Sequence, residues 1–263
     1  MKRILLILCL LSSAALGSWV FDSTDVVTIT DSDTMNFPDA NWAMAGWYKM
    51  TSNTGSSFRI IYQHTDWADA GAHFVLRGYE TSEATYGDDI RPMLDDDDAS
   101  EEYSSPTTNN CLADTSWHHF VYMRNAVTFH SIYIDGVVAV GPTTRPAIGA
   151  ISPAGNAFFG QDQDGGNDFL GKMAEWAFWT RALTETEIDK LSGTNGETAT
   201  SPANLGGDAG LAWHWDMYDF LDTASQTGSL TASHTTTAAD SADHPVSYAA
   251  ESTTPTAAYR RRM

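Results

Sequence analysis

One segment constrains the fold more than any other: residues 118–141, HHFVYMRNAVTFHSIYIDGVVAVG. Aromatic and β-branched residues alternate with other residues over two successive runs, the second of which spans residues 129–134. Alternation with a period of two is typical of strands that bury one face. Asp135-Gly136 then supplies the positive φ angles of a tight hairpin before residues 137–140. The segment therefore predicts a β-meander, with its first turn at residues 124–126.

The rest of the chain shows similar short apolar runs and almost no helical periodicity. Gly, Asn, Asp, Ser and Thr separate the runs, which is the pattern of an antiparallel all-β sandwich or barrel. Sandwiches of about this length often form a single domain. Further strands are expected at residues 19–21, 26–29, 42–50, 58–63, 72–78, 171–179 and 211–215, with a weak signal at 229–232.

A single helix is well signalled, in the segment RALTETEIDKL. Thr184 is a good N-cap, and Glu187 three residues later completes a capping box. Leu183 and Ile188 stand where a hydrophobic staple would fix the start of the helix. We expect a short helix that ends near Leu191.

The first residues, MKRILLILCLLSSAALGS, have the organisation of a secretory signal. Lys2 and Arg3 form a basic start, residues 4–11 an apolar core, and residues 15–17 the small residues of a cleavage site. A membrane-spanning helix needs about 20 apolar residues, and no stretch of the chain is that long. We predict a signal peptide over residues 1–17 and a secreted protein without a membrane span.

The mature protein is expected to form one domain over residues 18–248, followed by a flexible tail over residues 249–263. The tail, AAESTTPTAAYRRRM, has little to bury. Cys9 lies within the signal, so Cys111 alone remains after cleavage and no intramolecular disulfide can form. The hydrophobic core must therefore hold the fold.

Acidic residues greatly outnumber basic ones, with 34 Asp+Glu against 14 Lys+Arg and a formal net charge of −20. A surface this acidic repels nucleic acid and anionic membranes. It suits divalent cations, a salty exterior or simple solubility. The run MLDDDDASEEY is one concentrated source of this charge, and such runs usually form solvated loops.

Residues 160–169, GQDQDGGNDF, gather oxygen-bearing side chains around two glycines. Calcium binds six to eight hard oxygens from carboxylates, amides and backbone carbonyls, so this turn has the composition of a calcium site. An EF-hand is excluded, because Met173 stands at the twelfth position, where a glutamate is required. The alternative is a solvated turn in an acidic protein.

Three features in order carry a family resemblance. They are the opening WVFDSTDVVTI, the pair SWHHFVYMRN and IYIDGVV, and the strand, corner and helix of FLGKMAEWAFWTRALTETEIDKL. Together they resemble the laminin-G-like and pentraxin-like branch of the concanavalin A-like jelly rolls, over roughly Trp19 to Leu191. The resemblance implies an all-β fold, an antiparallel two-sheet jelly-roll sandwich with one short helix.

The resemblance also implies a calcium site. Pentraxins carry a Gly-Gln-Glu-Gln-Asp run whose acidic and amide residues bind calcium, and the corresponding run here is GQDQD. Two departures stand out: the first acid of the run is Asp rather than Glu, and Ala70 replaces an amide in an earlier loop. The family's disulfide is also absent, because the strand that should pair with Cys111 reads Ala43-Met44-Ala45. The implied calcium ligands are Asp162, Gln163, Asp164, Asn167 and Asp69.

No pattern of catalytic residues is present. Glycosidases of similar fold use paired carboxylates on one strand, and the nearest match, Glu187-Ile188-Asp189, lies in the expected helix and lacks the closing glutamate. Adjacent His118 and His119 point to opposite faces of a strand and cannot share a metal ion. We therefore expect no enzymatic activity, and a glycoside hydrolase is the least favoured class.

The tryptophan side chains have two alternative roles: packing in the core, or forming a platform on which sugar rings stack. Trp213 and Trp215 share a strand face, whereas Trp176 and Trp179 face opposite sides, and the core is the simpler reading for all four. Trp67, in a loop with Asp69, is the better candidate for ligand contact.

The sequence thus predicts a secreted, non-catalytic binding module. It would use calcium to recognise a glycan, a cell-surface polymer or another polar ligand. The alternative is a structural surface, filament or virion-decorating subunit that self-assembles through the same fold.

Overall fold

A computed structural model describes residues 18–215, with short gaps, together with residues 232–234 and 239–240. The gaps are residues 23–24, 32–34, 53–56, 66–70, 83–86, 97–101, 104–106, 108–109, 127–128, 145–147 and 206–208. The expected signal peptide and C-terminal tail lie outside the described residues.

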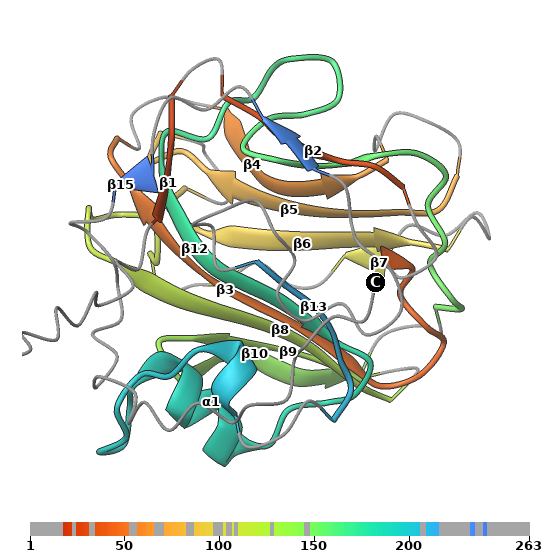
Figure 1. Ribbon diagram of the computed structural model, residues 1–263, viewed down its shortest axis with the longest axis vertical. Coiled ribbons are helices and arrows are strands. Elements are labelled where there is room, and N and C mark those ends of the chain that lie inside the picture. The colour runs from red at the N-terminus through yellow and green to blue at the C-terminus, as the bar shows by residue number, and fades with distance from the viewer. Residues whose placement is uncertain are drawn as a thin grey trace, which may run out of the picture.

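The described chain forms two antiparallel sheets packed face to face (Figure 1). The eight-stranded sheet has the order β10 (Val137–Thr144), β9 (Phe129–Ile134), β8 (His118–Ala126), β3 (Trp42–Met50), β12 (Gly171–Trp179), β1 (Ser18–Phe21) and β15 (Ala239–Asp240), with β13 (Leu211–Trp215) also paired to β12. The seven-stranded sheet has the order β14 (Ala232–His234), β2 (Val27–Ile29), β11 (Ala157–Phe159), β4 (Phe58–His64), β5 (His73–Tyr79), β6 (Ile90–Asp95) and β7 (Glu102–Tyr103). The predicted two-sheet jelly-roll sandwich is confirmed.

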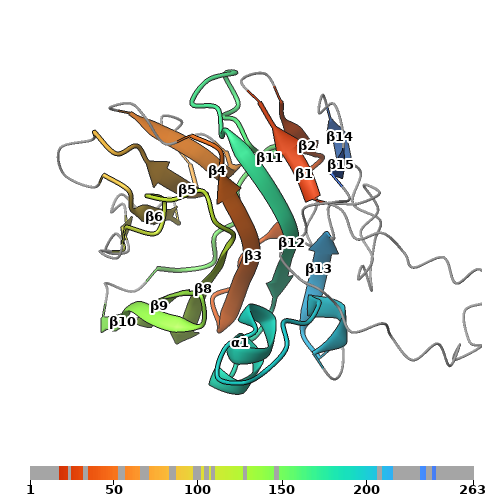
Figure 2. The same ribbon diagram turned by 90° about the vertical axis from the view of Figure 1, so that its left-hand side faces the viewer.

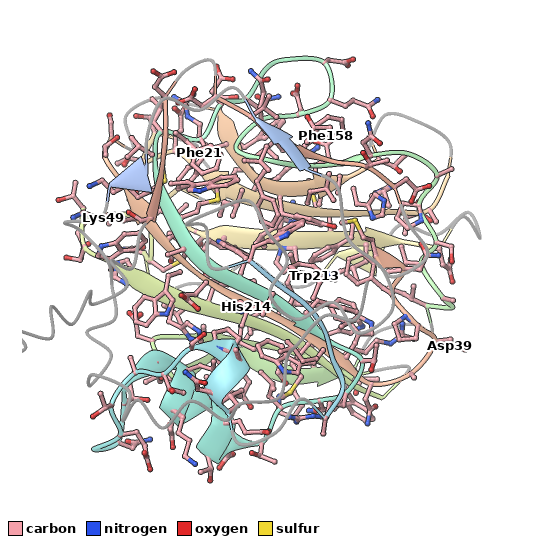
Figure 3. The ribbon with its side chains drawn as sticks, viewed as in Figure 1. Phe21, Asp39, Lys49, Phe158, Trp213 and His214 are labelled. Carbon is pink, nitrogen blue, oxygen red and sulfur yellow. The ribbon has the colours of Figure 1, made fainter. Side chains whose placement is uncertain are left out.

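The main core lies between the sheets and is rich in aromatic rings. Phe37 contacts Trp42, Phe74 and Phe178, with ring centroids 4.9 to 5.2 Å apart. Alternation along β13 gives one example of how the strands fill this core: Trp213 points into the core, whereas its neighbour His214 lies on the other face of the sheet (Figure 3). The period of two read from the sequence is therefore the period that fills the core.

The outer face of the eight-stranded sheet carries the helix α1 (Glu185–Ser192) (Figure 2). Below the helix lies a second apolar cluster, to which Trp179, Leu183, Ile188 and Leu191 contribute. The 3-10 helix η2 (Pro202–Asn204) follows α1 in the chain. Burial of the apolar side of α1, more than the intrinsic helix propensity of its residues, stabilises so short a helix.

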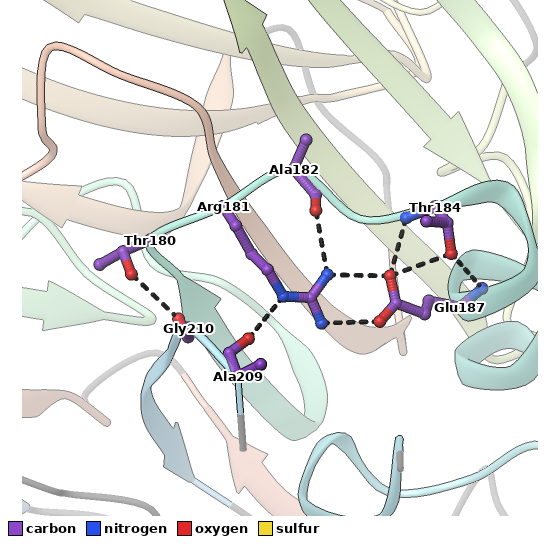
Figure 4. A network of polar contacts seen from close by, with 7 residues as sticks. All are labelled: Thr180, Arg181, Ala182, Thr184, Glu187, Ala209 and Gly210. Atoms are coloured by element: carbon purple, nitrogen blue, oxygen red, sulfur yellow. Dashed lines mark hydrogen bonds and ion pairs between the residues drawn. The ribbon is translucent and has the colours of Figure 1, made fainter. Parts of the chain in front are cut away.

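The predicted helix start is confirmed in detail. Thr184 accepts from the Glu187 backbone N–H, and the Glu187 carboxylate accepts from the Thr184 backbone N–H in return. Arg181 extends the capping box, because its guanidinium donates to both Glu187 carboxylate oxygens, at 2.9 and 2.6 Å (Figure 4). The hydrogen bonds from Arg181 lower the pKa of the Glu187 carboxyl group to about 2. Gly193 ends the helix in the left-handed conformation, with φ of 71°.

Some local expectations were wrong. Strand β8 continues to Ala126, so no turn lies at residues 124–126. The sequence patterns did not indicate β6, β7, β11 or β15, and only Ala232 of the weak 229–232 signal falls in a described strand. The ends of the acidic run MLDDDDASEEY lie in strands, since β6 ends at Asp95 and β7 is Glu102–Tyr103, and the expected solvated loop between them falls on residues 97–101, outside the described residues. Pairing with β5 extends from Ile90 to Asp95, so the first aspartate of the run belongs to the strand.

Candidate functional site

The oxygen-rich turn predicted from sequence connects β11 to β12. Within it the Asp162 carboxylate accepts three hydrogen bonds: from Gly166 N at 2.6 Å, from Asp164 N at 3.1 Å and from Asn167 Nδ2 at 2.7 Å. Gly165, with φ of 82°, lets the chain reverse between these donors. Asp162 thus organises the turn from its centre.

The base of the turn is fixed to β4. Ile60 N donates to Asn167 O at 2.8 Å, and Arg59 Nη1 donates to Asp168 O at 3.1 Å. Gln161 Nε2 donates to the Asp168 carboxylate at 2.6 Å, so the two ends of the turn are also joined to each other. The turn is therefore held on a rigid strand rather than standing free.

Four of the five predicted calcium ligands lie together in this turn. Gln163 and Asp164 are exposed, whereas Asp162 and Asn167 are half-buried. A carboxylate has about four lone-pair sites, and the three donors occupy most of those on Asp162. A cation would therefore first meet Asp164, Gln163 and the backbone carbonyls at the tip. Among the described residues, no three His, Cys, Asp or Glu side chains form a ready metal cluster.

The two remaining predicted site residues, Trp67 and Asp69, lie outside the described residues. His64 and His73, the strand residues on either side of that segment, lie at the far end of β4 and β5 from Ile60. The joint site of the two loops stays a prediction.

The other aromatic candidates belong to the core. Trp176, Trp179, Trp213 and Trp215 are all buried, with exposed fractions of 4% or less. Trp176 and Trp213 pack between the sheets, and Trp179 packs below α1. The core interpretation of these rings is confirmed, and none of them offers a platform for a sugar.

A buried polar cluster went unrecognised in the sequence. Glu175 lies at a bulge in β12 with φ of 54°, and its Oε2 accepts from His214 Nε2 at 2.8 Å and from Ser201 Oγ at 3.0 Å. Because the serine contacts the carboxylate and not the histidine, this is no nucleophile–base pair. The cluster ties the segment after α1 to β12 and β13. Its signal was the glutamate in an otherwise apolar strand, MAEWAFW.

The two adjacent histidines of β8 do differ in environment. His119 is buried against Trp47, whereas His118 lies between two carboxylates, 2.7 Å from Asp135 and 3.1 Å from Asp114. The hydrogen bond to Asp135 raises the pKa of His118. As expected, the two rings do not converge on a shared ligand.

No helix in the described part of the chain is long and apolar enough to cross a membrane.

Comparison with known proteins places this geometry in a wider group. A family model described as the concanavalin A-like lectin/glucanases superfamily matches residues 21–189. No curated protein sequence matches the chain.

Solved structures of similar fold come from several sources. A candidate carbohydrate-binding protein from Bacteroides ovatus has 15% identity and a TM-score of 0.55, and the match covers 86% of this chain and 60% of that one. The receptor-binding domain of botulinum neurotoxin C/D mosaic serotype has 11% identity and a TM-score of 0.52, covering 67% of this chain and 42% of the other. A heptameric SAP-like pentraxin from Limulus polyphemus has 17% identity and a TM-score of 0.42, covering 66% and 84%. The chain thus spans about three fifths or less of the first two structures.

Proposed function

The chain belongs to the concanavalin A-like lectin/glucanases superfamily, and from this premise we propose that it is a secreted, non-catalytic module that binds glycan. Calcium at the 160–168 turn would order the site or bridge to ligand hydroxyls. The observation that supports this proposal most directly is the exposed tip of that turn, formed by Gln163 and Asp164. The residues at the other end of the turn are hydrogen-bonded to β4, which holds the tip in place.

The chemistry of the turn fits this role. Carboxylate, amide and backbone oxygens are calcium's preferred ligands, and a calcium ion held by few protein ligands keeps positions open for sugar hydroxyls. Asp162 would act mainly by shaping the turn, because its oxygens already accept three N–H groups. Gln163, Asp164 and Asn167 would supply direct oxygens, with Asp69 and Trp67 added if their loop reaches the turn.

A glycan array, run with the purified chain in calcium and in chelator, tests this proposal. We expect binding to some glycans in calcium and its loss in chelator, with no hydrolysis of any bound glycan. Glycan binding that is equal in chelator would remove calcium from the proposal. Release of reducing ends would instead identify a glycosidase, and no glycan binding at all would contradict the proposed function.

One observation favours the structural-subunit alternative. Strand β10 is the last strand of its sheet, and Val137 and Val138 there are 68% and 49% exposed. Uncharged edge strands are sites where a second chain can add by backbone pairing. Sedimentation velocity separates the two functions: concentration-dependent polymers support a subunit, and a monomer that binds glycan supports the module.

A further inference from the structure

His118, the first residue of β8, lies between two carboxylates that come from different segments of the chain. Its Nδ1 is 2.7 Å from Asp135 Oδ2, at the turn between β9 and β10, and its Nε2 is 3.1 Å from Asp114 Oδ1, in the segment before β8. An ionised carboxylate only accepts hydrogen bonds, so each ring nitrogen faces an acceptor. Only the protonated imidazolium carries a hydrogen on both nitrogens, and only that form makes both hydrogen bonds.

The two carboxylates are not held equally. Asp135 is fixed by the backbone of His119, whose N–H donates to Asp135 Oδ1 at 2.8 Å and whose carbonyl accepts from Asp135 N at 2.8 Å. Asp114 lies on the exposed residues 113–116, and its side chain is 60% exposed. A neutral ring has one N–H group, which stays with the shorter and fixed contact to Asp135. Its bare Nε2 then repels the Asp114 carboxylate, because both groups are acceptors.

The other groups around the ring do not titrate in the same pH range. The Tyr48 ring of β3 packs against His118, with centroids 5.7 Å apart, and its hydroxyl donates to Cys111 O at 3.0 Å. Burial raises the pKa of Tyr48 and that of the Cys111 thiol, so both stay neutral while a histidine titrates. Among the described residues, Asp135 first and then Asp114 are the charged groups that raise the pKa of His118.

The segment that contains Asp114 crosses from the seven-stranded sheet to the eight-stranded one. Its first part is anchored, because Cys111 and Leu112 are buried and Leu112 N donates to Asp88 O at 3.0 Å. Residues 113–116 are exposed, and Ser116 N donates back to Asp114 Oδ1 at 2.6 Å. We call residues 113–116 the bend. The Asp114 contact therefore ties the bend to β8.

We propose that His118 is a pH-operated clamp, whose protonated ring joins the bend to the β9–β10 turn and whose neutral ring releases it. The inference is independent of the proposed glycan-binding function. The pKa of His118 is raised, so the folded chain holds this proton more tightly than the unfolded chain. The stability that the clamp contributes is thus complete below about pH 6.5 and is lost as the pH rises through the higher pKa of the folded state.

The clamp lies at the same end of the sandwich as the oxygen-rich turn. His118 is in register with Tyr48 near the end of β3, and Met50 at that end is in register with Gly171, where β12 begins after the turn. Release of the bend therefore changes the surface at the end of the molecule that carries the turn.

NMR spectroscopy of the full chain from about pH 5 to about pH 9 tests the clamp. The His118 ring signals report protonation, and relaxation of the Ala113 methyl group reports motion of the bend. We expect the methyl group to be ordered in acid and to become mobile as His118 loses its proton, with the same midpoint. His118→Gln, which cannot titrate, should leave the bend mobile throughout.

Asp114→Asn keeps the shape of the side chain and removes its charge. It should lower the pKa of His118 and abolish the pH step, because an amide can donate to the bare ring nitrogen as well as accept from the protonated one. A merely structural role for Asp114 would not shift the His118 titration. This variant changes an exposed position, so it also serves if His118→Gln does not fold.

Asp31→Asn is the matched control, because it removes a carboxylate beside His64, at the end of β4 farther from the turn. It should change neither the His118 titration nor the motion of Ala113. Motion of Ala113 that is the same on both sides of the titration overturns the clamp. A pH step of equal size in wild type and His118→Gln overturns it too, by assigning the step to another group. A His118 pKa that is the same in wild type and Asp114→Asn would show that Asp114 does not act on the ring.

Discussion

At the scale of single residues, burial decides which ionisable groups can respond to pH. His119 is 2% exposed, and desolvation lowers its pKa to about 3 from an ordinary value of 6.5. Its Nδ1 has no hydrogen-bond partner in the described part of the chain. The ring therefore stays neutral in the folded protein at any pH where the protein is expected to work.

His119 makes the fold sensitive to acid. The unfolded chain binds a proton here below about pH 6.5, whereas the folded chain does not, so stability falls as the pH drops from about 6.5 towards about 3. Between about pH 7 and pH 5 the loss from this group should approach about 2 kcal/mol. His119→Phe should remove that part of the loss.

Urea unfolding at both pH values measures the effect, with His118→Gln as the control. The pKa of His118 is raised, so protonation of that residue stabilises the fold and its replacement should steepen the acid loss. An identical pH dependence in wild type and His119→Phe would show that the ring is not buried in its neutral form.

At the scale of elements, the bulge in β12 depends on a close approach between strands. Between Ala174 and Ala177 the register with β3 shifts, and the Trp176 ring lies over Gly46. A Cβ on Gly46 would lie 2.5 Å from Trp176 Cε2 and closer still to Cδ2. Both sides are fixed, because Trp176 is fully buried and its Nε1 donates to Trp47 O at 3.2 Å.

Gly46→Ala is therefore expected to destabilise the fold by about 3 kcal/mol, at the upper end of what overpacking costs. Denaturant unfolding measures the change. Gly166→Ala serves as control, because the atom nearest to its Cβ would be 3.4 Å away. A Gly46→Ala variant as stable as this control would mean that the ring does not cover Gly46.

The helix, the hairpins and the strands differ in how far the sequence predicts them. The capping box at Thr184 and the hairpin at Asp135-Gly136 are local, so the residues themselves specify them. Strand β6 was missed because its partners, not its own pattern of Pro92 and acids, make it a strand. Register is equally non-local, which is why the facing of Arg77 and Arg91 could not be read from the chain.

The candidate site divides in the same way. That Asp162, Gln163, Asp164 and Asn167 lie together follows from their positions in one short turn. The closure of the turn around Asp162 depends on the directions of backbone N–H groups. The hydrogen bond from Ile60 to the turn depends on the pairing of segments that are distant in the sequence. Composition indicates neither of these.

At the scale of the whole molecule, net charge and sheet architecture act together. A charge of −20 opposes polyanions but raises the local concentration of cations, which favours calcium at an exposed acidic turn. The hydrogen bonds from β4 hold the turn in a fixed position, which preforms the proposed calcium site.

Calcium titration by calorimetry, paired with melting curves in calcium and in chelator, tests the central claim most directly. Wild type should bind calcium and melt at higher temperature with it, because an ion bound only to the folded state stabilises that state. Asp164→Ala should abolish both effects, whereas Glu197→Ala, which removes an exposed acid after α1, should preserve them. If wild type neither binds calcium nor gains stability, the turn is only a polar connection between β11 and β12, and calcium-assisted recognition is contradicted.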